Sequence, residues 1–204
     1  MIDFETTGLS PATGGRATEI AAVLVRDGQI VGHYASLMQS GAWVPPFIEQ
    51  MTGISNAMLE CAPPSGRVMR EVAAFVGDSP LVAHNAAFDR SFWCAELRRV
   101  DRAAAHRFAC TMLLARRLYP DSPNHRLGTL AALHRPPAAG RAHRALADAR
   151  TTASLLLHMQ RDVMRRFDLT GAPHELLLKL QRAPRDNLAG CVARHAAQAA
   201  EAVA

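Results

Sequence analysis

The chain has 204 residues and a formal net charge of +5, and apolar residues make up 49% of it. This length suits one α/β domain with its own hydrophobic core and a short appendage, and it excludes two full-sized domains. The composition is too apolar for a disordered chain, and no apolar run approaches the roughly 20 residues that cross a bilayer. Without a charged-then-apolar leader pattern, a cytoplasmic location is expected.

The positive charge is almost entirely arginine, because Lys179 is the single lysine among 23 basic residues. Guanidinium groups bind phosphates by donating two parallel hydrogen bonds, so this charge favours a nucleic-acid partner. The alternative is that an Arg- and Ala-rich chain reflects the base composition of its genome, which explains the same charge equally well. The four cysteines form no C-x-x-C pair, which predicts reduced thiols rather than a zinc site or a disulfide framework.

The first half of the chain predicts two strands joined by a tight hairpin at Gly28, followed by helices. Ser55 is the expected N-cap residue of the second helical turn. The expected strands cover 17–26 and 29–38, and the expected helical segments cover 47–51, 55–60 and 65–76.

The second half predicts short strands alternating with helices, which is typical of α/β domains. Asn85 separates a strand from a helix and is expected to cap that helix. The expected strands are 81–84 and 108–110, and the expected helices are 86–100, 111–118, 127–133, 145–167 and 174–182. A Pro-rich loop covers 134–142. An Ala-rich terminus ends the chain, so residues 1–168 are expected to form the domain and residues 169–204 a helical tail.

Asp3 and Glu5 lie two residues apart in the segment IDFETTG. In a strand, positions i and i+2 point to the same face, about 7 Å apart along the chain. The two carboxylates therefore converge, while Ile2 and Phe4 point into apolar packing on the other face. The Thr-Thr-Gly that follows provides backbone donors and a flexible residue that a ligand can approach closely.

Asp89 and Asp148 each begin the apolar stripe of a predicted helix. Compensation of the helix dipole explains one such acid about as well as a binding role. For four acids, two on a strand end and two at the starts of core-facing helices, a shared cation site is more economical. Oxygen ligands alone favour Mg²⁺ or Mn²⁺ over zinc or copper.

His143 precedes Asp148 by five residues, a rotation of about 140° if both were helical, so the two would not share a helix face. The histidine is better placed in the loop that enters the helix. Histidine changes its charge near neutral pH, which suits a general base that deprotonates an attacking water. The alternative is an ordinary surface histidine.

Three segments together resemble one enzyme family: IDFETTGL at residues 2–9, HNAAFD at 84–89, and HRALAD at 143–148. In this order and with this H-x-x-x-x-D spacing, they resemble the DEDDh 3′→5′ exonucleases, which include the proofreading ε subunit of bacterial DNA polymerase III and ribonuclease T. The likeness covers roughly residues 1–165.

The resemblance implies an RNase H-like, three-layer α/β/α fold around a mixed five-stranded sheet, with the active site at the strand ends. It implies two Mg²⁺ or Mn²⁺ ions. Asp3, Glu5 and Asp148 would ligate one ion, Asp3 would also touch the second, and Asp89 would support the second directly or through water. His143 would be the base in a two-metal hydrolysis that releases 5′-mononucleotides.

The resemblance also implies a substrate, the 3′ end of a single-stranded nucleic acid. The residues expected to hold its terminal nucleotide are Phe4, Thr6, Thr7, Gly8, Leu9, His84, Asn85 and Phe88. DNA is the expected substrate, and the alternatives are an RNA-trimming exoribonuclease or a nucleic-acid-binding module with weak catalysis. A polymerase subunit and a second copy of the chain are open partners; no membrane partner is expected.

The chain departs from the family pattern in three places. Only Met1 and Ile2 precede Asp3, so either the natural chain is longer or Asp3 is held by fewer ladder hydrogen bonds. Thr52, Gly53 and Ile54 stand where relatives carry His-Gly-Ile, which removes a potential phosphate contact. The tail from residue 169 carries no assignable motif.

Overall fold

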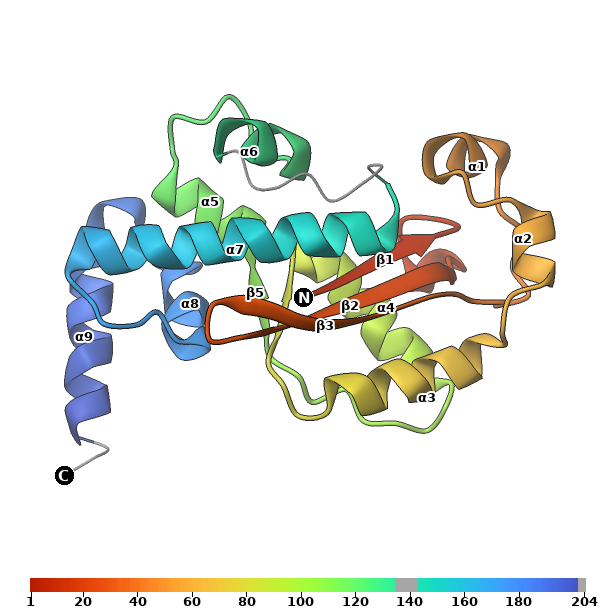
Figure 1. Cartoon of the computed structure of the whole chain (residues 1–204), viewed down its shortest axis with the longest axis horizontal. Coiled ribbons are helices and arrows are strands. Elements are labelled where there is room, and N and C mark those ends of the chain that lie inside the picture. The colour runs from red at the N-terminus through yellow and green to blue at the C-terminus, as the bar shows by residue number, and fades with distance from the viewer. Residues whose placement is uncertain (135–142, 202–204) are drawn as a thin grey trace.

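The computed structural model describes residues 1–134 and 143–201. The predicted Pro-rich loop therefore lies outside the described residues except for His134. Figure 1 shows three layers, with the long helix α7 on one face of the strands and helices α3 and α4 on the other. The elements in chain order are β1 (Ile2–Thr6), η1 (Pro11–Thr13), β2 (Ala17–Arg26), β3 (Gln29–Leu37), α1 (Pro46–Thr52), α2 (Asn56–Glu60), α3 (Ser65–Val76), β4 (Leu81–Ala83), α4 (Ala86–Arg98), β5 (Phe108–Cys110), α5 (Thr111–Leu118), α6 (Leu127–His134), α7 (Ala145–Phe167), α8 (His174–Leu180), η2 (Arg185–Asn187) and α9 (Leu188–Glu201).

Strands β2 and β3 form the predicted hairpin. Asp27 and Gly28 at its tip have φ values of 50° and 75°. Positive φ at both central residues is what a two-residue turn of the right twist requires, and Asp and Gly are among the residues that tolerate it. Ser55 accepts a hydrogen bond from the N–H of Met58 at 3.2 Å, as its predicted capping role requires.

The strands form two hydrogen-bonded ladders. β1, β2 and β3 pair antiparallel, while β4 and β5 pair parallel. β1 lies beside β4, so the spatial order is β3-β2-β1-β4-β5. The prediction of a mixed α/β/α fold is confirmed. The predicted five-stranded sheet is only partly confirmed, because the hydrogen bonds join the strands as one group of three and one group of two.

Alanines bring α7 unusually close to the strands. Ala145, Ala149 and Ala153 recur at steps of four along α7 and are fully buried against Ala21 and Val23 of β2. Side chains of one methyl group let a helix backbone approach a sheet closely, whereas larger ones would hold it away. The first turn of α7, which carries Asp148, therefore lies close above β1 and β2.

Asn85 differs from its predicted role. Its side chain makes no capping hydrogen bond, and its backbone has φ 63° and ψ 49°, in the left-handed region. Asparagine is one of the few residues that visit this region readily. Asn85 therefore turns the chain sharply from β4 into α4 rather than capping the helix through its side chain. Helix α4 also ends at Arg98, two residues earlier than expected.

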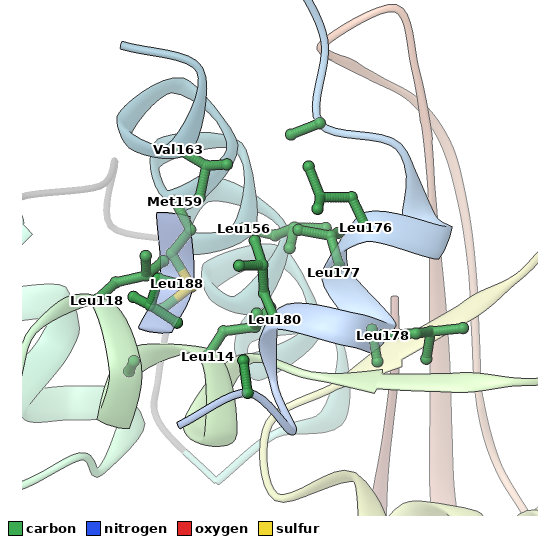
Figure 2. Close-up of a cluster of buried hydrophobic side chains, with 14 of the residues drawn as sticks. Leu114, Leu118, Leu156, Met159, Val163, Leu176, Leu177, Leu178, Leu180 and Leu188 are labelled. Carbon is green, nitrogen blue, oxygen red and sulfur yellow. The ribbon is translucent and has the colours of Figure 1, made fainter. Parts of the chain in front are cut away.

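The helices after residue 169 pack on the rest of the chain. Figure 2 shows leucines of α8 and α9 meeting α5 and α7 in one buried cluster, which includes Leu114, Met159, Leu177, Leu180 and Leu188. Gln181 closes the free edge of β5, because its side chain accepts from the N–H of Cys110 at 2.7 Å and donates to the carbonyl of Phe108 at 3.4 Å. The predicted boundary between residues 168 and 169 stays a prediction.

None of the helices within the described residues is both long and apolar enough to cross a membrane.

Candidate active site

The two strand acids point away from the core formed by α3 and α4. Ile2 and Phe4, which alternate with them on β1, are 1% and 4% exposed and pack on the side of α4. The two-residue period of a strand therefore turns Asp3 and Glu5 towards the opposite layer, where α7 begins. β1 pairs with β2 in unbroken register from Ile2 to Glu5, with a shift only after Glu5, and the N-terminal amine donates to the carbonyl of Val23 at 2.6 Å.

Three of the four predicted acids meet in space. Asp148 lies in the first turn of α7 and faces β1. One carboxylate oxygen from each of Asp3, Glu5 and Asp148 lies within 4.8 Å of the other two. Small side-chain shifts would bring all three oxygens onto one cation, because Mg²⁺–oxygen bonds of about 2.0–2.1 Å separate ligand atoms by about 3–4 Å.

Asp89 lies beside this cluster rather than within it. Its side chain is 2% exposed, and one oxygen accepts a hydrogen bond from the backbone N–H of Phe4 at 3.2 Å. This bond joins the first turn of α4 to the edge of β1, between the two strand acids. One oxygen of Asp89 is thus engaged by β1, and its role towards a second cation stays a prediction.

The electrostatics of the cluster favour a bound cation. Burial raises the pKa of Asp3 well above its ordinary value, and repulsion from Asp89, Glu5 and Asp148 raises it further. Burial and repulsion from Asp148 raise the pKa of Glu5 to about 8, and burial raises that of Asp89 to about 7. Buried like charges are costly without a compensating partner, and a divalent cation supplies that compensation.

His143 lies at the mouth of the cluster, in the segment that enters α7, as the sequence predicts. Its backbone N–H donates to Asp148 at 3.1 Å, and its φ of 58° turns the chain sharply. The residue is exposed, so its ring is free to reach a substrate.

Glu19 is a residue of the site that sequence reasoning missed. It lies directly opposite Glu5 on β2, yet two glutamates at such positions repel. Its carboxylate accepts two hydrogen bonds from Arg144, at 2.8 and 3.1 Å, and one from the N–H of Ala145 at 3.0 Å. Glu19 thereby ties the start of α7 to β2, which fixes the residues on either side of Arg144. The sequence did contain a signal for this role, because Glu19 is an acid within the otherwise apolar run of β2.

We predict that Glu19→Gln lowers kcat about 10- to 100-fold and changes KM less than about threefold. The loss of the ion pair with Arg144 lets His143 and Asp148 shift, and displacements near 1 Å cost rates of this size. Steady-state kinetics on an oligonucleotide measures both constants.

The matched control is Glu71→Gln, which removes an exposed ion pair with Arg67 on α3 and should leave both constants unchanged. An unchanged kcat in Glu19→Gln would show that the clamp does not position the site.

The loop after β1 is held in one conformation. Two hydrogen bonds join Thr7 to Arg16. The N–H of Thr7 donates to the carbonyl of Arg16 at 2.9 Å, and the N–H of Arg16 donates to the hydroxyl of Thr7 at 3.0 Å. The hydroxyl of Thr6 donates to the carbonyl of Gly8 at 2.8 Å. Leu9 at the tip is 89% exposed. The predicted contacts of Thr6, Thr7, Gly8 and Leu9 with a nucleotide stay predictions. The exposed loop tip is accessible to a ligand.

Two other predicted substrate residues face inwards, and their substrate role stays a prediction. Phe4 is buried with its ring 6.3 Å from that of Phe92, so its side chain belongs to the core. Both ring nitrogens of His84 are engaged, with the hydroxyl of Thr111 at 2.9 Å and the carbonyl of His125 at 3.0 Å. Burial also lowers the pKa of His84 to about 4, so it serves as a neutral structural link.

Asn85 and Phe88 are still available for a substrate role. Asn85 is exposed, and Phe88 is half-buried with its ring 5.0 Å from that of Phe92. Thr52 is fully buried, and its hydroxyl donates to the carbonyl of Ile48 at 2.9 Å. It therefore offers no contact to a phosphate, as the sequence predicts.

Comparison with known proteins identifies the family. Residues 1–156 match the sequence profile of the exonuclease family. The chain is 37% identical over 164 residues to a PolC-type DNA polymerase III of Bacillus subtilis, covering 79% of this chain and 11% of that protein. It is 34% identical over 164 residues to the 3′-5′ exonuclease DinG of Bacillus subtilis, covering 78% of this chain and 17% of that one. The chain thus spans a quarter or less of its curated relatives.

A solved structure extends the likeness to a protein of similar length. Exonuclease X, in complex with 5′ overhanging duplex DNA, is 31% identical, and the match covers 88% of this chain and 97% of that one with a TM-score of 0.66. The carboxylates of Asp3, Glu5 and Asp148 form a group that could hold a metal ion. The chain therefore belongs to the exonuclease family, as its three motifs predict.

Proposed function

We propose that this protein is a 3′→5′ exonuclease that hydrolyses the 3′-terminal phosphodiester of single-stranded DNA and releases 5′-mononucleotides. One observation carries the proposal: Asp3, Glu5 and Asp148, from two separate elements, bring carboxylate oxygens within 4.8 Å beside His143. The direction is supported by the name of the DinG relative, and the DNA substrate by the complex of exonuclease X.

The donor set suits two Mg²⁺ or Mn²⁺ ions, because all four acids offer hard oxygen ligands. When bound, such ions polarise the phosphate and stabilise the charge on the attacking and leaving oxygens. Asp3, Glu5 and Asp148 would hold one ion, with Asp89 supporting the other.

The protein's own part in the reaction is positioning and proton transfer. A water oxygen forms a bond to the terminal phosphorus while the bond from phosphorus to the 3′ oxygen breaks. His143 accepts the proton of the water, and the leaving 3′ oxygen takes a proton from solvent. The backbone of residues 6–9, fixed by the hydrogen bonds between Thr7 and Arg16, would hold the terminal nucleotide.

The test is hydrolysis of a 5′-labelled single strand of DNA with Mg²⁺, with Mn²⁺, and with EDTA. We expect a ladder of strands shortened from the 3′ end, nucleoside 5′-monophosphates as product, and no cleavage in EDTA. Equal cleavage in EDTA would exclude the metal-dependent reaction. Faster cleavage of RNA of the same sequence would assign the protein to the exoribonucleases instead.

A polymerase partner is also proposed, and it rests on the name of the PolC-type relatives. Co-purification of the protein with a DNA polymerase subunit from its own cells would test it, and a lone chain would exclude a stable complex.

A further inference from the structure

A groove lies between the loop after β1 and the outer face of α4. Its volume is about 500 Å³. Residues 10–12 form one wall, and residues one and two turns apart along α4, with its C-cap residue, form the other, namely Ser91, Cys94, Ala95, Arg98 and the C-cap Arg99. The small side chains of the first three leave room for a ligand backbone, and two guanidinium groups stand at the far end.

The groove carries excess positive charge, which favours binding of an anion. Arg98 is exposed and has no carboxylate within 4 Å among the residues that the structure describes. Arg99 lies 3.8 Å from Glu96, but that carboxylate is already held by Arg16 through two hydrogen bonds of 2.8 and 3.0 Å. One buried carboxylate thus faces two guanidinium groups, and Arg98 adds a third positive charge.

The groove begins beside two of the predicted nucleotide-contact residues. Its first wall follows directly after Leu9, and Phe88 lies three and seven residues before Ser91 and Ala95, on the same side of α4. From Asp89 to Arg98 the helix rises nine residues, or about 14 Å at 1.5 Å per residue. That length exceeds the spacing of two successive phosphates, so the arginines would meet phosphates upstream of the terminal one. The pair of Arg16 and Glu96 holds the two walls together beneath the groove.

We infer that this groove binds the phosphodiester backbone of the strand being shortened, a few nucleotides upstream of its 3′ end, with Arg98 and Arg99 as the phosphate ligands. The inference rests on the proposed exonuclease function for its orientation. Guanidinium forks match phosphate oxygens with two parallel hydrogen bonds, and such contacts are independent of base sequence. The groove therefore gives affinity that depends on strand length.

The test compares the parent protein with the double variant Arg98→Ala/Arg99→Ala. The dissociation constant for a fluorescent single strand of about 12 nucleotides is measured by anisotropy in EDTA across a series of salt concentrations. We expect about tenfold weaker binding and a plot of log affinity against log salt whose slope is shallower by about 1.4, since each phosphate contact to a single strand contributes about 0.7. Binding of a dinucleotide, which has no phosphate upstream of the terminal one, should change less than about twofold.

The matched control is Arg182→Ala/Arg185→Ala, which removes the same charge from exposed positions at the distant end of the chain (Figure 1). The control should keep the slope of the parent. An identical slope in both double variants would overturn the groove, as would a loss confined to duplex DNA, which would assign the arginines to the complementary strand. Because EDTA prevents metal-dependent cleavage, a parent protein that binds but never hydrolyses DNA would refute only the proposed function.

Discussion

Asp3→Asn is expected to lower kcat/KM on single-stranded DNA by at least about a thousandfold in Mg²⁺. Asparagine keeps the shape of the side chain and its place on β1 but removes one anionic ligand from the cluster of three. A thousandfold loss corresponds to about 4 kcal/mol of transition-state stabilisation, which is a reasonable share for a cation that stabilises both oxygens of the displacement. Single-turnover kinetics with enzyme in excess over DNA but below saturation measures kcat/KM without interference from product release.

The same variant should stabilise the metal-free protein. Burial and mutual repulsion raise the pKa of Glu5 to about 8 and that of Asp3 well above its ordinary value. An acid with a raised folded-state pKa costs stability as pH climbs from its unfolded value, near 4.5 for Glu5, through its folded value. The melting temperature of the parent in EDTA should therefore fall between pH 5 and pH 8, and that of Asp3→Asn should fall less.

These two readouts separate a ligand from a structural residue. A damaged fold would lower activity and melting temperature together, whereas loss of a ligand lowers activity and raises the melting temperature in EDTA at pH 8. Added Mg²⁺ should raise the melting temperature of the parent more than that of the variant. Asp27→Asn, on the exposed hairpin turn, is the matched control. Activity of Asp3→Asn within tenfold of the parent would remove the metal site from the mechanism.

The sequence predicted the positions of three acids where these depend on a local period. The alternation along β1 correctly turns Asp3 and Glu5 to one face, and the apolar stripe of α7 correctly places Asp148 at its start. The strand and helix order also followed from local pattern and turn residues. That the acids would meet rested on the economy of one shared cation site and on the family resemblance, because no period within one element sets the distance between β1 and α7.

The features that sequence reasoning missed all depend on contacts between distant segments. Glu19 and Arg144 are 125 residues apart. Their pairing depends on the register of β1 on β2 and on where α7 packs against the strands. Gln181 closes the edge of β5 across 71 residues for the same reason. Asn85 was misread as a side-chain cap because asparagine suits both a cap and a left-handed turn, and only the path from β4 to α4 decides between them.

His143→Asn is expected to lower kcat about a hundredfold to ten-thousandfold with KM changed less than about threefold. This range is typical for loss of a general base. Asparagine is chosen because residue 143 has a φ of 58°, a conformation that asparagine tolerates better than alanine does. The backbone N–H that donates to Asp148 is unaffected by the substitution, so the cluster keeps its geometry. The variant should still bind DNA as the parent does.

Proton transfer can be distinguished from positioning in the same variant. If His143 takes the proton of the attacking water, free imidazole in solution should restore part of the lost turnover, because the residue is exposed and leaves space for it. The rate of the variant should also rise with hydroxide concentration, since solvent must then supply the deprotonated nucleophile. His33→Ala, at an exposed histidine of β3, is the control and should keep the kinetics of the parent. A loss expressed only in KM, without rescue by imidazole, would make His143 a substrate-positioning residue and leave the base to be found elsewhere.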